Sequence, residues 1–437
     1  MPDQPTRDDA DKLYDVAIVG GGLAGVVSLA YARRAGLEAI VLEKQGRVGG
    51  LWRDLPAWQD IQISAAYWTL GDLPLLGVTQ PHILANIEAW VQHFGLADGI
   101  RLNAPVQRAG AVASGWEMET PQGIVRARHV VAATGAHNTP VIPPVARSNS
   151  DVREMHSSAL VDPAVLVGRD VVVVGGGASA FDLLDLCLQH GARRIVWVYR
   201  GLHWFTPTRK PKHIAGSVRG FARMQASGMT AAEQSAAIGA DLRSRYEKFG
   251  IAEIMPAHDF DVRHDQLIPG RPGMLEHMAR IERHRGSVEG IDGRIVTLSD
   301  GHRVEADLLL WGTGYSVDLS YFESPGIASI RSLGALADRC GCIFRSLDAA
   351  NLYFPSVGLD GIGAAPWAYS LLCRSIMSHI SGTAQLDNQT LGYNVNHFEI
   401  VDYLAPRDRA SYPEPAWRAH YRDLALNTPD EQPYPIP

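Results

Sequence analysis

The sequence has few cysteines, no long apolar runs and no excess of positive charge, and each shortage excludes a class of protein. Four cysteines in 437 residues cannot support a disulfide-stapled fold. No apolar run reaches the ~18 residues needed to span a bilayer, and Arg169 and Asp170 precede the Val-rich stretch near Val171. The net charge of −7, from 40 basic and 47 acidic residues, argues against an electrostatic nucleic-acid binder.

The rest of the composition is that of an ordinary globular protein. Hydrophobic residues make up 46% and charged residues 20% of the chain, which excludes a wholly disordered protein. The length predicts about two or three domains. The polar, acidic start MPDQPTRDDADK predicts neither a secretion signal nor a transit peptide, so we expect a cytoplasmic protein. Arginine outnumbers lysine, which favours a GC-rich bacterial source.

The first glycine cluster follows a short apolar run near the N-terminus. Residues 14–19 (YDVAIV) predict a buried strand, and a helical pattern follows the glycine turn through Arg34. Gly20, Gly22 and Gly25 have the spacing of a dinucleotide-binding turn, in which a tight turn, close approach to a pyrophosphate and close helix packing each favour glycine.

The next predicted strand, residues 38–42, ends in Glu43, 18 residues after Gly25. A carboxylate at this point can accept hydrogen bonds from both ribose hydroxyls of an adenosine. The first unit therefore predicts a site for the ADP half of FAD, and the alternative is a glycine-rich turn of any α/β domain.

A second unit repeats the pattern. Residues 170–174 (DVVVV) predict a strand, and Gly175, Gly177 and Ala180 form a GxGxxA turn before another helix. The following strand ends in Tyr199-Arg200 rather than in an acid, and arginine can bind a 2′-phosphate bidentately. We therefore predict an NADPH site, and the alternative is a solvated charge at a strand end. More basic residues follow closely: His203, Arg209, Lys210 and Lys212.

Further motifs lie between and after the two units. They are Gly49-Gly50-Leu51-Trp52-Arg53, residues 131–135 (VAATG) with Pro140 and Pro143, His156-Ser157, Arg200 with Trp204, residues 310–315 (LWGTGY), and residues 351–354 (NLYF) with Gly358. In this order, over roughly residues 14 to 380, the set resembles the flavin-containing monooxygenase family, within the wider flavoproteins that have two dinucleotide-binding domains.

The resemblance implies an α/β fold with two Rossmann-like dinucleotide-binding domains, the NADPH domain being inserted in a discontinuous FAD domain. We expect the first part of the FAD domain over residues 12–148 and the NADPH-binding domain over residues 149–315. The return of the FAD domain and a C-terminal extension take residues 316–437. Two crossings make a two-stranded hinge, and a homodimer would be usual for this family.

The resemblance also implies the site residues. The cofactor-binding positions are Gly20, Gly22, Gly25, Glu43, Gly50, Trp52, Thr134, Gly135, Gly175, Gly177, Ala180, Arg200, Gly312, Thr313, Gly314 and Gly358. Gln62 stands where the family places an Asn that faces the flavin, so Gln62 and Trp52 are the candidate catalytic residues. The alternatives are a turn residue for Gln62 and a wall of the FAD pocket for Trp52. Trp204 is expected either beside the nicotinamide or in a packed core.

The activity that the resemblance implies is oxygenation of a small organic molecule with NADPH and O2, through a flavin C4a-(hydro)peroxide, at nitrogen or sulfur. Ser150 and Val152 replace the Phe and Gly that precede the family's His. This departure keeps open a dehydrogenase or oxidase and makes a standard Baeyer–Villiger enzyme less expected, although Baeyer–Villiger and ring-hydroxylating oxygenation stay among the alternatives. A non-catalytic nucleotide sensor is disfavoured because both glycine motifs are intact.

The cysteines and histidines predict no further site. Disulfide reductases of related fold carry a CxxC or CxxxxC pair beside the flavin, and none occurs near Gly49 and Gly50. The pair Cys340 and Cys342 has no partners at ligand spacing, and the sixteen histidines are scattered. We therefore expect no metal.

Overall fold

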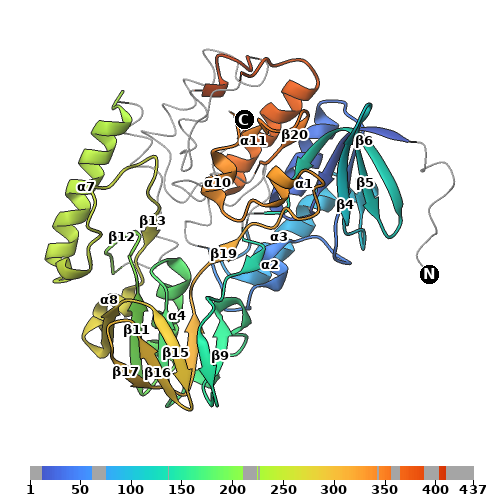
Figure 1. Ribbon diagram of the computed structural model, residues 1–437. Coiled ribbons are helices and arrows are strands. Elements are labelled where there is room, and N and C mark those ends of the chain that lie inside the picture. The colour runs from blue at the N-terminus through green and yellow to red at the C-terminus, as the bar shows by residue number, and fades with distance from the viewer. Residues whose placement is uncertain are drawn as a thin grey trace.

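The computed structural model describes residues 12–61, 75–135, 137–209, 224, 227–341, 344–355, 365–387 and 403–409. It contains two lobes, each built on a largely parallel sheet, with β19 (Tyr315–Ser316) between them (Figure 1). We call them the first lobe and the second lobe, after the order in which their first strands occur along the chain.

The first lobe is built on a sheet that has seven strands within the described residues. Its strands are, in order, β3 (Ile100–Arg101), β2 (Ala39–Leu42), β1 (Leu13–Val19), β6 (Gly123–Ala132), β5 (Gly115–Thr120) and β4 (Arg108–Val112), with β20 (Leu352–Tyr353) also paired to β6. Strand β1 is parallel to both β2 and β6, as a βαβ crossover requires. The chain therefore returns to this sheet late, through β20.

The second lobe is built on five parallel strands, as far as the structure describes the chain. They are β14 (Ile281–Arg285), β11 (Arg194–Tyr199), β10 (Asp170–Val174), β18 (Leu308–Trp311) and β9 (Arg153–His156). Side chains alternate across this sheet: Val171 and Val173 pack on the helical side, and Val172 and Val174 pack on the other. That other side is covered by an antiparallel ladder, β15 (Val288–Asp292), β16 (Ile295–Leu298) and β17 (Arg303–Glu305), with β8 (Ala146–Ser148) at its edge.

Helices cover the sheets of both lobes (Figure 1). Before residue 100 the chain forms α1 (Leu23–Arg34), α2 (Leu51–Asp54) and α3 (Gln80–His93). The middle of the chain forms α4 (Ala178–Gln189), α7 (Ala231–Lys248) and α8 (Pro272–Glu276), with the short strands β12 (Trp204–Thr206) and β13 (Leu267–Pro269). After residue 320 it forms α9 (Pro325–Ala328), α10 (Leu333–Ala337) and α11 (Ala365–Ile380). Helix α11 packs on α1, where Ser28 Oγ donates to Cys373 Sγ at 3.2 Å.

The late return of β20 and α11 to the first lobe confirms the predicted fold class, an α/β protein with one nucleotide-binding unit inserted in another. The chain passes between the two lobes twice, and the two passing segments, β7 (Thr139–Pro140) and β19, pair as an antiparallel ribbon. Strand β8 already pairs with β15 of the second lobe. The domain ranges 12–148, 149–315 and 316–437 stay a prediction.

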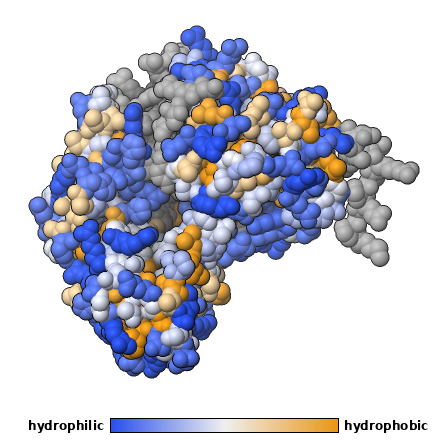
Figure 2. Space-filling model, viewed as in Figure 1, coloured by the Kyte–Doolittle hydropathy of each residue, from blue (hydrophilic) through white to orange (hydrophobic). Residues whose placement is uncertain are grey.

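Hydrophilic and hydrophobic residues are interspersed over both lobes on the face shown in Figure 2. Within the described ranges, no helix combines the length and the apolar character that a membrane crossing requires.

Candidate functional site

The first glycine turn has a backbone that only glycine fits. Gly20 has a φ of +106°, and a Cβ there would lie 2.6 Å from the carbonyl oxygen of Ala133. A Cβ on Gly25 would lie 1.9 Å from the carbonyl oxygen of Gly20, so any side chain would push α1 away from β1. The turn also packs against the segment that carries Thr134, because the same Cβ on Gly20 would lie 3.4 Å from the Cα of Thr134.

The N-terminus of α1 faces a second glycine. Gly22 caps the helix without a side-chain hydrogen bond, and the first turn of α1 has no acidic residue. A Cβ on Gly50, which has a φ of +54°, would lie 2.8 Å from the Cα of Gly22. The two glycine backbones are thus packed together beside the N-terminus of α1, and a helix N-terminus favours an anion such as a pyrophosphate.

Glu43 lies at the end of β2 and is buried beside this turn. Its Oε2 accepts from the backbone N–H of Gly21 at 2.5 Å, and its Oε1 accepts from the N–H of Gln45 at 2.7 Å. A carboxylate has about four acceptor positions, so two remain for ribose hydroxyls. The turn and the acid are thus locked together by one hydrogen bond.

The second glycine turn also packs closely against neighbouring backbone, but its partners differ from those of the first turn. Gly175 has a φ of +139°, and a Cβ there would lie 2.1 Å from the carbonyl oxygen of Gly312. The third small residue of this GxGxxA turn is Ala180, and a Cβ on Gly312 would lie 2.7 Å from its Cα. Gly177 caps α4 without a side-chain hydrogen bond, and no acidic residue lies in the first turn of that helix.

Arg200 follows β11 directly and lies beside the second turn. The carbonyl oxygen of the next residue, Gly201, is 1.9 Å from the position of a Cβ on Gly176, so the two backbones are in close contact. His203 donates its backbone N–H to the carbonyl of Gly176 at 3.2 Å, which fixes the loop. Arg200 is exposed, and over the described part of the chain it has neither an ion pair nor a hydrogen bond.

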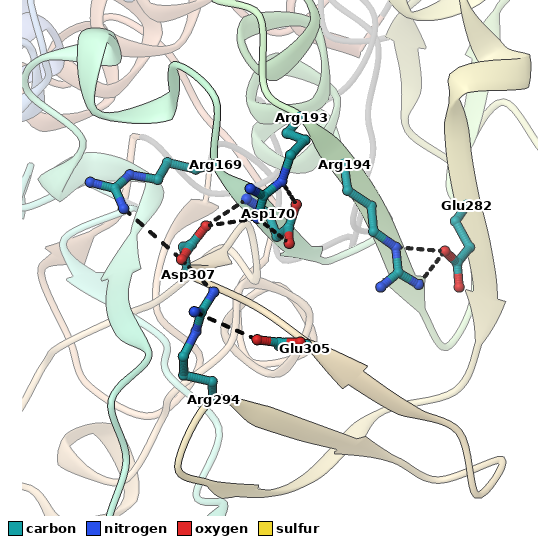
Figure 3. A network of polar contacts seen from close by, with 8 residues as sticks. All are labelled: Arg169, Asp170, Arg193, Arg194, Glu282, Arg294, Glu305 and Asp307. Atoms are coloured by element: carbon teal, nitrogen blue, oxygen red, sulfur yellow. Dashed lines mark hydrogen bonds and ion pairs between the residues drawn. The ribbon is translucent and has the colours of Figure 1, made fainter.

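Two neighbouring arginines at the opposite end of β11 are paired. Arg193 binds Asp170 through two hydrogen bonds, at 2.8 and 2.6 Å, and Arg194 binds Glu282 at 2.6 Å (Figure 3). Asp307 joins the same network through Arg294 at 2.6 Å. Arg200 instead follows the carboxyl end of β11, and ligands bind at the carboxyl edge of the sheet in open α/β folds.

The LWGTGY segment is hydrogen-bonded to residues 139–141, the other segment that passes between the lobes. Thr313 Oγ1 donates to the carbonyl of Val141, whose own N–H donates to the carbonyl of Gly314 at 3.0 Å. His156 Nε2 lies 3.0 Å from that same Gly314 oxygen, and its ring contacts the ring of Tyr315 edge-on at 4.9 Å. Burial lowers the pKa of His156. A neutral His156 that donates to the crossing thus positions the two segments.

A contact between the lobes was not expected from the sequence. Trp58 Nε1 donates to the carbonyl of Leu160 at 2.6 Å, and Gln59 Nε2 lies 3.3 Å from Asp182 Oδ2 on α4. Asp182 is buried and also forms an ion pair at 2.8 Å with Arg271, which is 2% exposed. No spacing in the sequence connects these residues, because they are brought together only by the packing of one lobe on the other.

The other predicted residues lie in different surroundings. Trp52 is half-buried against the first core, and its carbonyl accepts from Gln80 Nε2 at 2.7 Å, which favours a wall position. Trp204 is fully buried against Tyr246 and Phe260, so it packs in the second core. Gly135 has a φ of +84° and open space beside its Cα. Gln62, Gly358, Lys210 and Lys212 lie outside the described residues, and Arg209 lies 5.8 Å from the Phe249 ring centroid.

The described cysteines are buried single thiols. Cys187, Cys340 and Cys373 form no disulfide, and burial raises the pKa of each thiol to about 12. Such thiols are not ionised at neutral pH and are poor nucleophiles.

Two glycine turns, one with a buried acid and one with an exposed arginine, define a protein with two dinucleotide-binding units. A family model described as pyridine nucleotide-disulphide oxidoreductase matches residues 17–238, which is half of the chain. The chain belongs to this family.

Similar proteins share this architecture. A "Baeyer-Villiger monooxygenase" of Streptomyces coelicolor is 26% identical over 69% of this chain, and the match spans 64% of that relative's length. A flavin-containing monooxygenase from Stenotrophomonas maltophilia superposes with a TM-score of 0.60 at 18% identity, covering 85% of this chain and 99% of the other. A structure of OTEMO with FAD and NADP superposes with a TM-score of 0.67 at 13% identity, covering 92% and 98%. At these identities, the two structures show the fold alone.

Proposed function

We propose that this protein is an FAD- and NADPH-dependent monooxygenase that oxygenates a small organic molecule at nitrogen or sulfur. The observation that carries the proposal is Arg200, which is exposed and unpaired among the described residues and precedes Gly201, whose backbone packs on Gly176 of the second glycine turn. A guanidinium there suits the 2′-phosphate of NADPH. The names of the relatives support the oxygenase activity.

The first glycine turn fits FAD. The N-terminus of α1, which has no acidic residue in its first turn, suits the pyrophosphate, and Glu43 retains acceptor positions for the adenosine ribose. When bound and reduced by NADPH, FAD supplies the oxygen chemistry. The chain's own residues then hold the two nucleotides in register, and the crossing at His156 and Gly314 sets the position of one lobe against the other.

Disulfide reduction is the other activity that the family's description suggests, and the thiols argue against it. Such a reaction needs a reactive thiolate pair beside the flavin. The sequence has no CxxC, and the described thiols are buried with pKa values raised to about 12.

The test is to measure NADPH consumed, peroxide released and product formed by the flavin-loaded protein, with a thioether, a tertiary amine or a cyclic ketone present. We expect sulfoxide or N-oxide in amounts close to the NADPH consumed. Peroxide equal to NADPH with every substrate would instead establish an oxidase. Bound FAD that NADPH never reduces would establish a nucleotide sensor.

A ketone substrate is the second candidate, because the Streptomyces relative is named a Baeyer–Villiger monooxygenase. Lactone formation from the cyclic ketone, without sulfoxide from the thioether, would favour it. The assembly as a homodimer, the cytoplasmic location and the bacterial source stay predictions, as do the catalytic roles of Gln62 and Trp52.

A further inference from the structure

A group of two histidines and a carboxylate lies away from both glycine turns. His284 is on β14, and Asp300 and His302 are in the turn between β16 and β17. One ligand atom from each lies within 4.8 Å of the other two. His284 Nδ1 is 3.0 Å from Asp300 Oδ2, and His302 Nδ1 is 3.1 Å from Asp300 Oδ1.

We propose that His284, Asp300 and His302 bind one divalent transition-metal ion of the Zn²⁺ class. Two imidazole nitrogens and one carboxylate oxygen are a common ligand set for zinc, and they leave a fourth position for water. Tetrahedral bonds of about 2.0–2.1 Å place ligand atoms roughly 3.3 Å apart. The distances of 3.0 and 3.1 Å run to different oxygens of Asp300, and one ligand atom from each residue lies within 4.8 Å of the others, so the three side chains must draw closer around the ion.

The surroundings of His284 hold its ring in the orientation that a metal needs. His284 Nε2 lies 2.9 Å from Glu282 Oε1, two residues earlier on the same face of β14. Arg194 in turn binds Glu282 Oε2 through its Nε at 3.0 Å and its Nη2 at 2.6 Å (Figure 3). When Nε2–H donates to Glu282, the lone pair of Nδ1 points toward Asp300. Metal-binding histidines usually have such a carboxylate behind them.

Burial distinguishes the three ligands. His284 is 9% exposed, whereas the side chains of Asp300 and His302 are 29% and 64% exposed. An ion can therefore reach the group from solvent, while the ring of His284 is already fixed. Bound there, it would tie the last residues of β14 to the β16–β17 turn.

The alternative is a metal-free group in which His284 carries two protons. Burial lowers the pKa of His284, but the hydrogen bonds to Glu282 and Asp300 outweigh this and raise it. In that arrangement both ring nitrogens donate to carboxylates, and no lone pair is available to an ion. Metal binding and this arrangement exclude each other, so titration with a metal separates them.

The experiment uses the full chain without a polyhistidine tag, stripped with a chelator and dialysed. Zn²⁺ is titrated by calorimetry, and Co²⁺ is added separately to record its visible absorption, which is intense when the ion is tetrahedral. We expect one ion per chain, a cobalt spectrum of the tetrahedral type, and an unfolding temperature that rises with Zn²⁺.

Three variants decide the assignment. His302→Ala, at the exposed ligand, should abolish binding and the thermal shift while leaving the fold intact. Glu282→Gln should weaken binding about 10- to 100-fold, as loss of a supporting carboxylate does. His264→Ala is the matched control, because His264 is exposed and contacts a single carboxylate, Asp261, at 2.8 Å. It should bind as the unaltered protein does.

Two outcomes would overturn the proposal. One is no heat of binding and no cobalt spectrum at protein concentrations of tens of micromolar. The other is binding that His302→Ala leaves unchanged, which would place the ion elsewhere on the chain.

Discussion

The two glycine turns share a backbone design but differ at two positions. The third position is Gly25 in the first turn and Ala180 in the second. Gly25 faces the carbonyl of Gly20 in its own turn, whereas Ala180 faces Gly312, which directly follows the neighbouring strand β18. The residue at the end of the following strand is a buried Glu43 in one case and an exposed Arg200 in the other.

Contacts within the protein explain the residue at the third position of each turn. In the first turn Gly25 avoids a clash with the Gly20 carbonyl, and in the second turn Gly312 makes room for Ala180. Glu43 is fixed by hydrogen bonds to Gly21 and Gln45. Arg200 has no such partner in the described ranges, and its proposed role is to bind the 2′-phosphate of NADPH.

The largest expected effect comes from exchanging the third positions. In Gly25→Ala, the new Cβ meets a backbone oxygen that cannot move, and overpacking of cores generally costs about 1–3 kcal/mol even when side chains can adjust. We expect protein without FAD and a lower urea midpoint. Ala180→Gly, the matched change, should retain FAD and lose less stability. Normal flavin content in Gly25→Ala would show that α1 tolerates displacement.

The next largest effect concerns the two arginines at opposite ends of β11. Arg200→Ala should lower kcat/KM for NADPH roughly 10- to 100-fold, as loss of a charge-assisted phosphate contact does, and change that for NADH by less than about twofold. Arg194→Ala, which removes an arginine already paired with Glu282, should change neither. Steady-state flavin reduction with both nucleotides measures this. An equal fall in kcat/KM for NADPH and for NADH would contradict the proposal that Arg200 binds the 2′-phosphate.

A smaller effect is expected from Glu43→Gln. The amide can replace only one of the two carboxylate acceptors, so the N–H of Gly21 or Gln45 loses its partner. An unsatisfied buried donor costs about 1–3 kcal/mol. FAD should bind about tenfold more weakly, measured by titrating the apoprotein and following flavin fluorescence. Unchanged affinity together with unchanged stability would contradict both roles of Glu43.

The smallest effect is expected from Asp170→Asn, at the amino edge of the second sheet. Hydrogen bonds from Arg193 lower the pKa of Asp170 in the folded protein. Its contribution to stability is therefore present above the unfolded-state value of about 3.9 and is lost as pH falls through the lowered folded value. Urea unfolding of both proteins should show a slight difference at pH 7 that shrinks as the pH falls below about 3.9. A difference that is the same at every pH would point to packing instead.

The fold and the nucleotide turns were predictable because each depends on residues close together in the sequence. An apolar strand, three spaced glycines and a helix fix one another locally, and Glu43 and Arg200 follow at the end of the next strand. The ordered motifs also predicted the return of the chain, which β20 and α11 confirm.

Contacts between distant segments were not predictable in the same way. The hydrogen bond from Trp58 to Leu160 and the buried pair of Asp182 and Arg271 depend on how the lobes and helices pack. The meeting of His284 with Asp300 and His302 depends on the register of a hairpin beside β14. An Asp-x-His sequence in a turn was the one local signal for it, and that signal is weak without the strand.

The ribbon of β7 and β19 has a consequence for how such proteins can be rearranged. The chain leaves the first lobe beside Pro140 and comes back beside Tyr315, and these two residues are paired. Entry and exit are therefore neighbours, so the intervening segment can be exchanged for that of a relative by two adjacent splices. Such an exchange would also have to keep the hydrogen bonds of Trp58 with Leu160 and of Gln59 with Asp182, which join the two lobes away from the ribbon.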